Sequence, residues 1–415
     1  MTDVDIYIDL DGNTQSIGRL RRAPARGGET VLFEYTPEWL AADSRFPLEP
    51  TLNLTRGTFA PPKGQLMFGS IGDSAPDTWG RRLMQRKERR RAEQEGRTPR
   101  TLSETDYLLG VADETRLGAL RFTWTGTRTF EAPLNAGIPA LISLGNLLAI
   151  TERILRNEET DDDLQLIFAP GSSLGGARPK ASVMDAAGHL SIAKFPKETD
   201  EYSIETWEEV ALRLAEQAGI TTPHHQLIEV AGKPVMLSRR FDRSDGFRIP
   251  FLSAMAMTGS QDGERGSYPE IVDTLTRNGA RVKEDTQELY RRVVFNVLIS
   301  NVDDHLRNHG FLRINRNGWA LSPAYDLNPV PIDLKERILT TNIDLDEGTC
   351  SIDVLEKAAG YFNLGLKAAR EIIKSVATST ATWRTVAAQV GARNPEIDRM
   401  ASAFEHADLD RAKRL

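Results

Sequence analysis

The most constraining part of this chain is a polar segment at residues 301–308 (NVDDHLRN), directly after an apolar helix predicted at residues 293–300. A short strand pair is predicted next, at residues 310–313 and 319–321, followed by SPAYDLNP at residues 322–329. Two carboxylates and an amide are thereby presented around one hairpin. We therefore expect a fold that holds these groups together as a site.

The spacing within this region is that of a protein-kinase-like site. Asn308 lies five residues after Asp303, and Asp326 lies twenty-three residues after it. In such a site one Asp orients and deprotonates the attacking hydroxyl, an Asn five residues later holds Mg²⁺, and a second Asp beyond a hairpin also holds Mg²⁺. The chain has no HRDxxxxN segment, but it keeps the D-x-x-x-x-N spacing. The alternative is a solvated helix end whose Asp and Asn residues act as caps and turn formers.

Length and composition exclude several other classes of protein. With 415 residues, two to three domains are expected, at about 100–200 residues each. The net charge of −7 does not favour nucleic acid as a bulk partner, and the single cysteine, Cys350, excludes a disulfide scaffold or a cysteine-rich metal site. No apolar run approaches the ~18 residues of a membrane span, and the acidic N-terminus is unlike a signal peptide. We expect a soluble, cytoplasmic protein with no membrane partner.

Changes in sequence pattern divide the chain into three expected parts. Residues 1–130 read as a mostly β-rich subdomain with a helical insert. We expect residues 131–245 to form a kinase-like N-lobe with a glycine-rich loop and a hinge, and residues 246–415 to form a mainly helical C-lobe with the catalytic and Mg²⁺-binding loops. The predicted fold class is α+β, a protein-kinase-like bilobal fold with a β-rich N-terminal subdomain and a mainly α-helical C-terminal lobe.

Some local expectations are specific enough to check. Strands are predicted at residues 5–10, 30–35 and 116–123, with a turn signal at residues 27–28 between the first two. The run EETDDD at residues 158–163 reads as an acidic loop, and residues 181–184 and 190–195 read as the two strands of a hairpin.

A glycine-rich stretch, GSSLGGARPK at residues 171–180, is the second candidate for chemistry. Small residues let backbone N–H groups approach an anion, and Lys180 adds a charge, although the stretch is not a Walker A motif. Lys194 lies in an apolar strand, like the kinase lysine that pairs with the α- and β-phosphates. Glu208 and Glu209 on the next helix are candidates for the ion pair that orients Lys194. A flexible loop, an edge lysine and a solvated helix face are the respective alternatives.

The order of these elements is that of a kinase bilobe, and the chain resembles the HipA family of serine/threonine kinases, the toxins of HipA/HipB toxin–antitoxin modules. The segments that carry the resemblance are DTWGRRLM (77–84), RLGALRF (116–122), SSLGGARPKASV (172–183), SIAKFP (191–196), RRFDR (239–243), NVDDHLRNHGFL (301–312) and LSPAYDLNP (321–329).

The resemblance implies roles for individual residues. It makes Asp303 the catalytic Asp, accompanied by His305 and Asn308 in the catalytic loop, and it makes Asn308 and Asp326 the Mg²⁺ ligands. It places an adenine-binding hinge at residues 238–242. The residues implied to contact ATP are Ser172, Ser173, Leu174, Gly175, Gly176, Ala177, Lys180, Lys194, Glu208, Arg239, Phe241, Asp242 and Asp326.

The resemblance also implies regulation and partners. Ser173 matches a serine whose autophosphorylation ejects the glycine-rich loop and silences the kinase. The implied protein substrate is an aminoacyl-tRNA synthetase, typically the glutamyl enzyme, and the implied partners are a HipB-like helix-turn-helix antitoxin and, through it, operator DNA. Two alternatives stay open: a catalytically weak corepressor bound to the antitoxin, and a HipA-like kinase with a different protein substrate.

The chain departs from the family's pattern at three positions. Asp304 follows the catalytic Asp where Gly is frequent, Arg239 stands at a hinge position that often carries Glu, and Trp207 precedes the helix glutamate where Asn is frequent. The arginine run at residues 81–97 has two interpretations, a solvated helix face or a patch that touches DNA phosphates. We interpret the pair His224 and His225 as a loop before a strand rather than a metal site.

Overall fold

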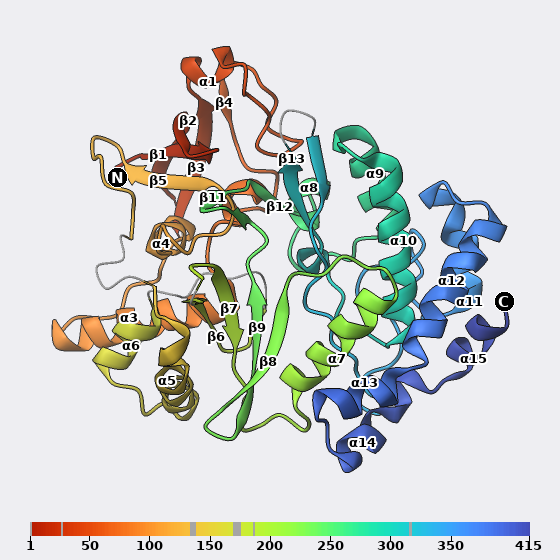
Figure 1. Ribbon diagram of the computed structural model, residues 1–415. Helices are drawn as coiled ribbons and strands as arrows, with labels where there is room; N and C mark the ends of the chain where they lie inside the picture. Colours follow the sequence, from red (N-terminus) through yellow and green to blue (C-terminus); the bar gives the residue numbers. More distant parts are fainter. Residues whose placement is uncertain (1, 26–27, 133–137, 169–175, 186, 315–317) are drawn as a thin grey trace. The chain divides into compact units, whose positions relative to one another are not determined.

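The computed structural model describes residues 2–25, 28–132, 138–168, 176–185, 187–314 and 318–415 (Figure 1). The chain forms two compact units. Unit 1 comprises Met1–Lys197, Val230–Lys233 and Arg239–Leu252, and unit 2 comprises Glu198–Glu229, Pro234–Ser238 and Ser253–Leu415. Antiparallel sheets and helices are both present, which confirms the α+β prediction. The division at residues 130 and 245 stays a prediction.

Unit 1 begins with an antiparallel sheet in the order β4-β3-β2-β1-β5. Its strands are β1 (Val4–Leu10), β2 (Asn13–Ala25), β3 (Gly28–Tyr35), β4 (Thr58–Phe59) and β5 (Leu120–Trp124). Alternation explains β1, which buries Val4, Ile6 and Ile8 on one face. The strands predicted over residues 5–10 and 30–35 are confirmed, the one predicted over residues 116–123 begins only at Leu120, and β2 was not predicted. A register shift between Ile6 and Tyr7 and a largely polar sequence hide its alternation.

The helices of unit 1 are α1 (Pro37–Ala41), α2 (Gly69–Gly72), α3 (Thr78–Gln94), α4 (Glu104–Gly110), η1 (Leu141–Ser143), α5 (Leu144–Arg156) and α6 (Asp161–Phe168). Three of them, α3, α5 and α6, share a cluster of buried residues that includes Trp79, Leu83, Ile150 and Ile154.

The acidic run is not a simple loop, because α6 begins within it. The N–H of Asp163 donates to Oγ1 of Thr160 (3.1 Å), and the N–H of Thr160 donates to the carboxylate of Asp163 (2.9 Å). This is a reciprocal N-terminal cap, and the helix dipole favours carboxylates in the first turn. The prediction of a loop over residues 158–163 is therefore wrong for its second half.

A second sheet has the strand order β6-β7-β9-β8. The predicted hairpin is confirmed as β6 (Lys180–Met184) and β7 (Leu190–Lys194), which pair antiparallel with Lys180 opposite Lys194. The other strands are β8 (His225–Val230) and β9 (Lys233–Arg239), and a small hairpin follows from β10 (Arg243–Ser244) and β11 (Phe247–Arg248).

Unit 2 is mainly helical, as predicted. Helix α12 packs against α10, α15 and α7, and its buried residues include Ile373 and Val376. The elements are α7 (Ile204–Gln217), β12 (Phe251–Ser253), α8 (Ala254–Thr258), α9 (Tyr268–Asn278), α10 (Val282–Leu298), η2 (Leu306–Asn308), β13 (Gly310–Ile314), β14 (Gly318–Leu321), α11 (Ile352–Ala358), η3 (Ala359–Phe362), α12 (Leu366–Thr380), α13 (Trp383–Val390), α14 (Asn394–Phe404) and α15 (Ala407–Arg414). Helices α14 and α15 were not predicted.

Candidate functional site

The polar segment of unit 2 follows a sharp helix end. Helix α10 stops at Leu298, and Ser300 adopts a left-handed backbone with φ of 53°. The Ser300 hydroxyl donates to the carbonyl of Ala403 (2.8 Å), which holds this strained turn in place. The side chain of Asp303 is then 63% exposed, whereas that of Asp304 is 1% exposed. Of the two neighbouring carboxylates, Asp303 is thus the accessible one.

Asn308 closes the loop that Asp303 opens. Its Nδ2 donates to the carbonyl oxygen of Asp303 (3.1 Å), which accounts for the five-residue spacing. Its Oδ1 is buried and has no hydrogen-bond partner within the described residues. Such an oxygen suits a hard cation, because Mg²⁺ is bound by carboxylate, amide and water oxygens. The Oδ1 of Asn328 and the Nδ1 of His305 are also buried and lack a hydrogen-bond partner among the described residues.

The hairpin β13–β14 brings Asp326 back to this loop. Phe311 pairs with Leu321, and beyond the hairpin the Tyr325 hydroxyl donates to the carbonyl of Arg307 (2.7 Å). Two residues after Asp326, the N–H of Asn328 donates to Oδ1 of Asn301 (3.3 Å). Contacts on both sides of Asp326 therefore attach it to the loop that carries Asp303 and Asn308.

The backbone of Asp326 is itself unusual, with φ of 55°. A left-handed conformation is disfavoured for a residue with a Cβ and costs about 1 kcal/mol or more. Strain of this kind is held by its surroundings and concentrates at functional sites.

Sequence reasoning missed a buried polar network beside Asp303. The hydroxyl of Tyr268 donates to Oδ2 of Asp304, and Nε2 of His309 lies 2.7 Å from Oδ1 of Asp304. Nδ2 of Asn296 donates to the Tyr268 oxygen (3.1 Å), and Nδ2 of Asn301 donates to Oδ1 of Asn296 (3.0 Å). Burial, and next the charge of Asp304, raise the pKa of Tyr268 well above 10, so Tyr268 stays a neutral donor. The only signal in the sequence was Asp304 at a position where Gly is frequent.

In unit 1, Lys180 and Lys194 lie opposite each other on β6 and β7, and both are buried. Directly opposed residues of antiparallel strands project from the same face of a sheet. The ammonium of Lys180 pairs with the carboxylate of Asp77 (2.9 Å), and its carbonyl accepts from the indole N–H of Trp79 (3.2 Å). The DTWG segment at the start of α3 therefore holds the base of the glycine-rich stretch.

Part of that stretch is not described. Ser172, Ser173, Leu174 and Gly175 lie outside the described residues. The next two predicted residues, Gly176 and Ala177, are exposed. Gly176 has φ of +95°, and a Cβ there would lie 3.1 Å from Nζ of Lys180, so this position favours glycine.

The two helix glutamates are both buried on α7. Glu209 pairs with Arg213 (2.6 Å) and His225 (2.8 Å). Burial lowers the pKa of His225, but its contacts with Glu209 and Glu216 outweigh burial and raise it. Within the described residues, no cluster of three or more His, Cys, Asp or Glu side chains could hold a metal ion.

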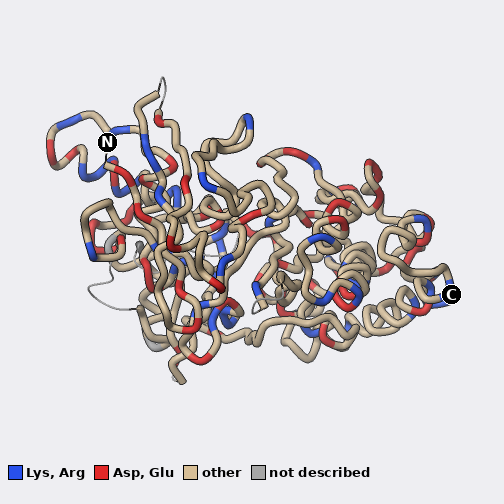
Figure 2. Tube along the Cα trace, turned by 90° about the horizontal axis from the view of Figure 1, so that it is seen from above, with Lys and Arg blue, Asp and Glu red and all other residues tan. Residues whose placement is uncertain are grey.

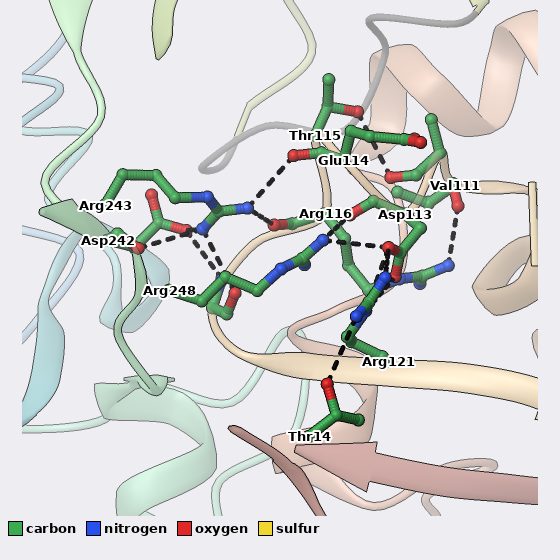
Figure 3. A network of polar contacts seen from close by, with 12 residues as sticks. Thr14, Val111, Asp113, Glu114, Thr115, Arg116, Arg121, Asp242, Arg243 and Arg248 are labelled. Carbon is green, nitrogen blue, oxygen red and sulfur yellow. Dashed lines mark hydrogen bonds and ion pairs between the residues drawn. The ribbon is translucent and has the colours of Figure 1, made fainter. Parts of the chain in front are cut away.

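The expected hinge residues separate by burial. Arg239 and Phe241 are half-buried, whereas Asp242 is fully buried in the polar network of Figure 3. Its Oδ1 accepts from Nε of Arg240 (2.6 Å), and its Oδ2 accepts from Arg240, Arg243 and the N–H of Gly118. The Asp242 carboxylate is therefore committed to the protein's own groups.

The arginine run on α3 is largely paired within unit 1. Arg81 binds Glu104, and Arg97 binds Glu88, where the hydrogen bond from Arg97 is the first of several contacts that lower the carboxyl pKa to about 2. Arg86, Arg90 and Arg91 pair with Glu159, Asp161 and Glu95 respectively. Figure 2 shows Lys and Arg interleaved with Asp and Glu along the trace. This pairing favours the solvated-face interpretation over DNA contact.

Two family models match this chain. The HipA-like C-terminal domain matches residues 172–384, and the HipA N-terminal domain matches residues 8–105.

No helix in the described part of the chain combines the length and apolarity needed to span a membrane.

Similar proteins were found at low identity. "Putative kinase Y4dM" of Sinorhizobium fredii is 30% identical over 159 residues, which cover 34% of this chain and 38% of that protein. A "Putative kinase" of Haemophilus influenzae is 23% identical over 188 residues, which cover 39% of this chain and 54% of that protein. The matched region thus spans about two fifths to half of the length of these relatives.

A solved structure has the same fold along nearly the whole chain. The structure of HipA of Shewanella oneidensis MR-1, in complex with HipB and its operator DNA, superposes with a TM-score of 0.66 at 17% identity. The match covers 99% of this chain and 97% of that one. It confirms the kinase-like fold class predicted from the sequence.

Proposed function

This chain belongs to the HipA family, and on that basis we propose that it is an ATP- and Mg²⁺-dependent serine/threonine protein kinase acting as the toxin of a toxin–antitoxin module. The observation that carries the proposal is the arrangement of Asn308. Its amide nitrogen fixes the Asp303 backbone. Its buried Oδ1 has no hydrogen-bond partner among the described residues and is therefore available to a ligand. A capping role alone would not leave a buried oxygen unpaired.

In the proposed reaction the hydroxyl oxygen of a protein serine or threonine attacks the γ-phosphorus, and the bond from that phosphorus to the oxygen of ADP breaks. Asp303 accepts the hydroxyl proton, consistent with its exposed carboxylate. Asn308 and Asp326 would hold Mg²⁺, which neutralises phosphate charge when bound. His305 would help to order the catalytic loop.

The nucleotide would be held mainly by groups of unit 1. Lys194 would contact the phosphates, and Lys180 with the backbone of residues 172–177 would support the glycine-rich loop around them. The burial of both lysines on one sheet face supports this assignment. Glu208 is proposed as the helix glutamate, because Glu209 pairs with Arg213 and His225. Arg239 and Phe241 would lie near the adenine.

The substrate and regulation proposed here follow from family membership. We assign an aminoacyl-tRNA synthetase as substrate, with the glutamyl enzyme first, and autophosphorylation of Ser173 as the inhibitory event. A HipB-like helix-turn-helix antitoxin, which would carry the pair to operator DNA, is the proposed partner. The Shewanella protein of the same fold was solved with HipB and operator DNA, which supports this choice.

The test uses phosphatase-treated protein, labelled ATP and Mg²⁺, with mass spectrometry to locate the phosphate. Wild type should label Ser173, Ser173→Ala should lose that site but label added glutamyl-tRNA synthetase, and Asp303→Asn should do neither. Wild type that binds no ATP and labels neither protein would overturn the kinase proposal and leave the corepressor. Labelling of Ser173 without labelling of the synthetase would overturn only the substrate.

A further inference from the structure

The four residues 239–242 divide into two kinds by burial. Arg239 and Phe241 keep partial exposure, whereas Arg240 and Asp242 are 1% and 0% exposed. This pattern runs from the end of β9, at Arg239, into the turn at residues 241–242. Arg240 and Asp242 form a side that is committed to the interior of unit 1, whereas Arg239 and Phe241 stay half-buried, with the Phe241 ring 6.2 Å from that of Phe251 between centroids.

The committed side is fastened to one loop of the N-terminal region. The guanidinium of Arg240 donates to the carbonyls of Thr115 (2.9 Å) and Arg116 (3.3 Å). Arg243 donates to the carbonyls of Arg116 (2.7 Å) and Gly118 (3.2 Å). Both arginines also bind the Asp242 carboxylate, which accepts the N–H of Gly118 (2.7 Å). Hydrogen bonds between side chains and backbone therefore join residues 115–118 to residues 240–243 (Figure 3).

A second set of contacts extends the attachment. Arg248 donates to the carbonyl and carboxylate of Asp113, and Arg121 holds the same carboxylate from β5. The segment folds back on itself, because the N–H of Ile249 donates to the carbonyl of Asp242 (2.9 Å). The close fit requires glycine at residue 118, where φ is +73° and a Cβ would lie 3.2 Å from the backbone nitrogen of Phe251.

The same segment is joined to the strand that carries Lys194. The N–H of Arg240 donates to the carbonyl of Leu190 at the start of β7 (2.9 Å). Residues 113–118 are thus attached to a segment that is itself attached to the lysine-bearing hairpin. Charge-assisted hydrogen bonds that are shielded from water hold such an arrangement more rigidly than exposed ones.

We propose that Asp242 and Arg240 are positioning residues, through which the loop at residues 113–118 sets the conformation of an adenine-binding hinge at Arg239 and Phe241. This inference rests on the proposed nucleotide site. In this proposal the Asp242 carboxylate acts on ATP binding through the hinge and does not itself contact ATP. The N-terminal region is then part of the nucleotide site's framework rather than a separable module.

The test measures ADP and GDP affinity by calorimetry on the full chain, with circular dichroism to check folding. Asp242→Asn keeps the size of the side chain and its acceptor for Gly118 but removes the charge that the two arginines share. ADP binding should weaken by at least about tenfold, or about 1.4 kcal/mol, and the preference for ADP over GDP should shrink. A lost base preference is a readout that loss of folded protein alone does not produce.

A second variant and a control make the result decisive. Arg243→Lys keeps the positive charge but loses the fork that reaches Arg116 and Gly118, and it should shift ADP affinity in the same direction. Glu34→Gln removes an exposed ion pair with Arg21 in the same unit and should leave ADP affinity unchanged. If Asp242→Asn does not fold, the ADP affinity of Arg243→Lys tests the positioning role in its place.

The outcomes separate this inference from the proposed function. Wild type that binds neither nucleotide would overturn the kinase proposal and this inference together. Wild-type binding with unchanged ADP affinity and base preference in the folded variants would overturn only the positioning role.

Discussion

Asp304 and His309 lie against each other in the interior of unit 2, with 2.7 Å between Oδ1 and Nε2. The approach lacks hydrogen-bond geometry, so it is a close contact rather than a hydrogen bond. On its other oxygen Asp304 accepts from Tyr268. The carboxylate that follows Asp303 in the chain is therefore buried between His309 and Tyr268, with Tyr268 as its hydrogen-bond donor.

We predict that Asp304→Asn lowers kcat about tenfold to a hundredfold, because a small displacement of the neighbouring Asp303 misaligns the attacking hydroxyl. The KM for ATP should stay within about twofold, since the variant removes an interaction needed in the transition state. Steady-state kinetics check this, with Asp262→Asn, an exposed carboxylate paired with Arg307, as control. A change in KM alone would contradict the prediction.

Asn308→Ala should raise the Mg²⁺ concentration needed for half-maximal activity about tenfold to a hundredfold, which is the usual loss of metal affinity when a supporting residue of a metal site is removed. Asn308→Asp keeps a ligand oxygen but loses the donor to the Asp303 carbonyl, so Mg²⁺ dependence should recover while kcat stays low. Asn394→Ala, at an exposed helix start, is the matched control. Equal Mg²⁺ dependence in Asn308→Ala and wild type would exclude Asn308 as a ligand.

Asp77→Asn should destabilise the protein by about 3 kcal/mol, because it leaves the buried Lys180 ammonium without its carboxylate. Asn is as good an N-cap as Asp, so the contact from the N–H of Gly80 should survive and the loss reports the ion pair. Urea unfolding checks this. Combination with Lys180→Met should restore part of the loss, and additive losses would show that the pair is not coupled.

His406 should make stability depend on pH. Burial, and next the charge of Arg337, lower its pKa from 6.5 to about 4. Between about pH 6.5 and about pH 4 the unfolded chain therefore carries a proton on His406 that the folded chain does not. The free energy of unfolding consequently falls as pH drops from about 6.5 to about 4, by up to about 3 kcal/mol. His406→Asn keeps an acceptor for the N–H of Leu409 and should flatten this slope. Urea titrations at several pH values test it, with the exposed His224→Asn as control. An unchanged slope in His406→Asn would refute the assignment.

Local pattern predicted the elements that carry the site. The hairpin of Lys180 and Lys194, the helix before Asp303 and the strand pair before Asp326 all follow from alternation, helical spacing and turn residues over short stretches. The D-x-x-x-x-N spacing has a local cause as well, since Asn308 binds the Asp303 carbonyl.

Contacts between distant parts of the chain were beyond such reasoning. Lys180 meets Asp77, and Asp242 meets Gly118 more than a hundred residues away in sequence. No periodic pattern in the sequence indicates the partner in either contact. Motif resemblance predicts Asp242 beside ATP, and the sequence gives no sign of the two arginines that its carboxylate binds.

The central claim is that Asp303 is the base of a phosphoryl-transfer site, and the most direct measurement is the initial rate of Mg²⁺-dependent phosphate transfer from labelled ATP. Asp303→Asn should lower this rate by about 10²–10⁴ while ADP affinity is kept. Asp398→Asn, an exposed carboxylate on α14, should transfer phosphate at the wild-type rate. Equal rates for wild type and Asp303→Asn would contradict the account.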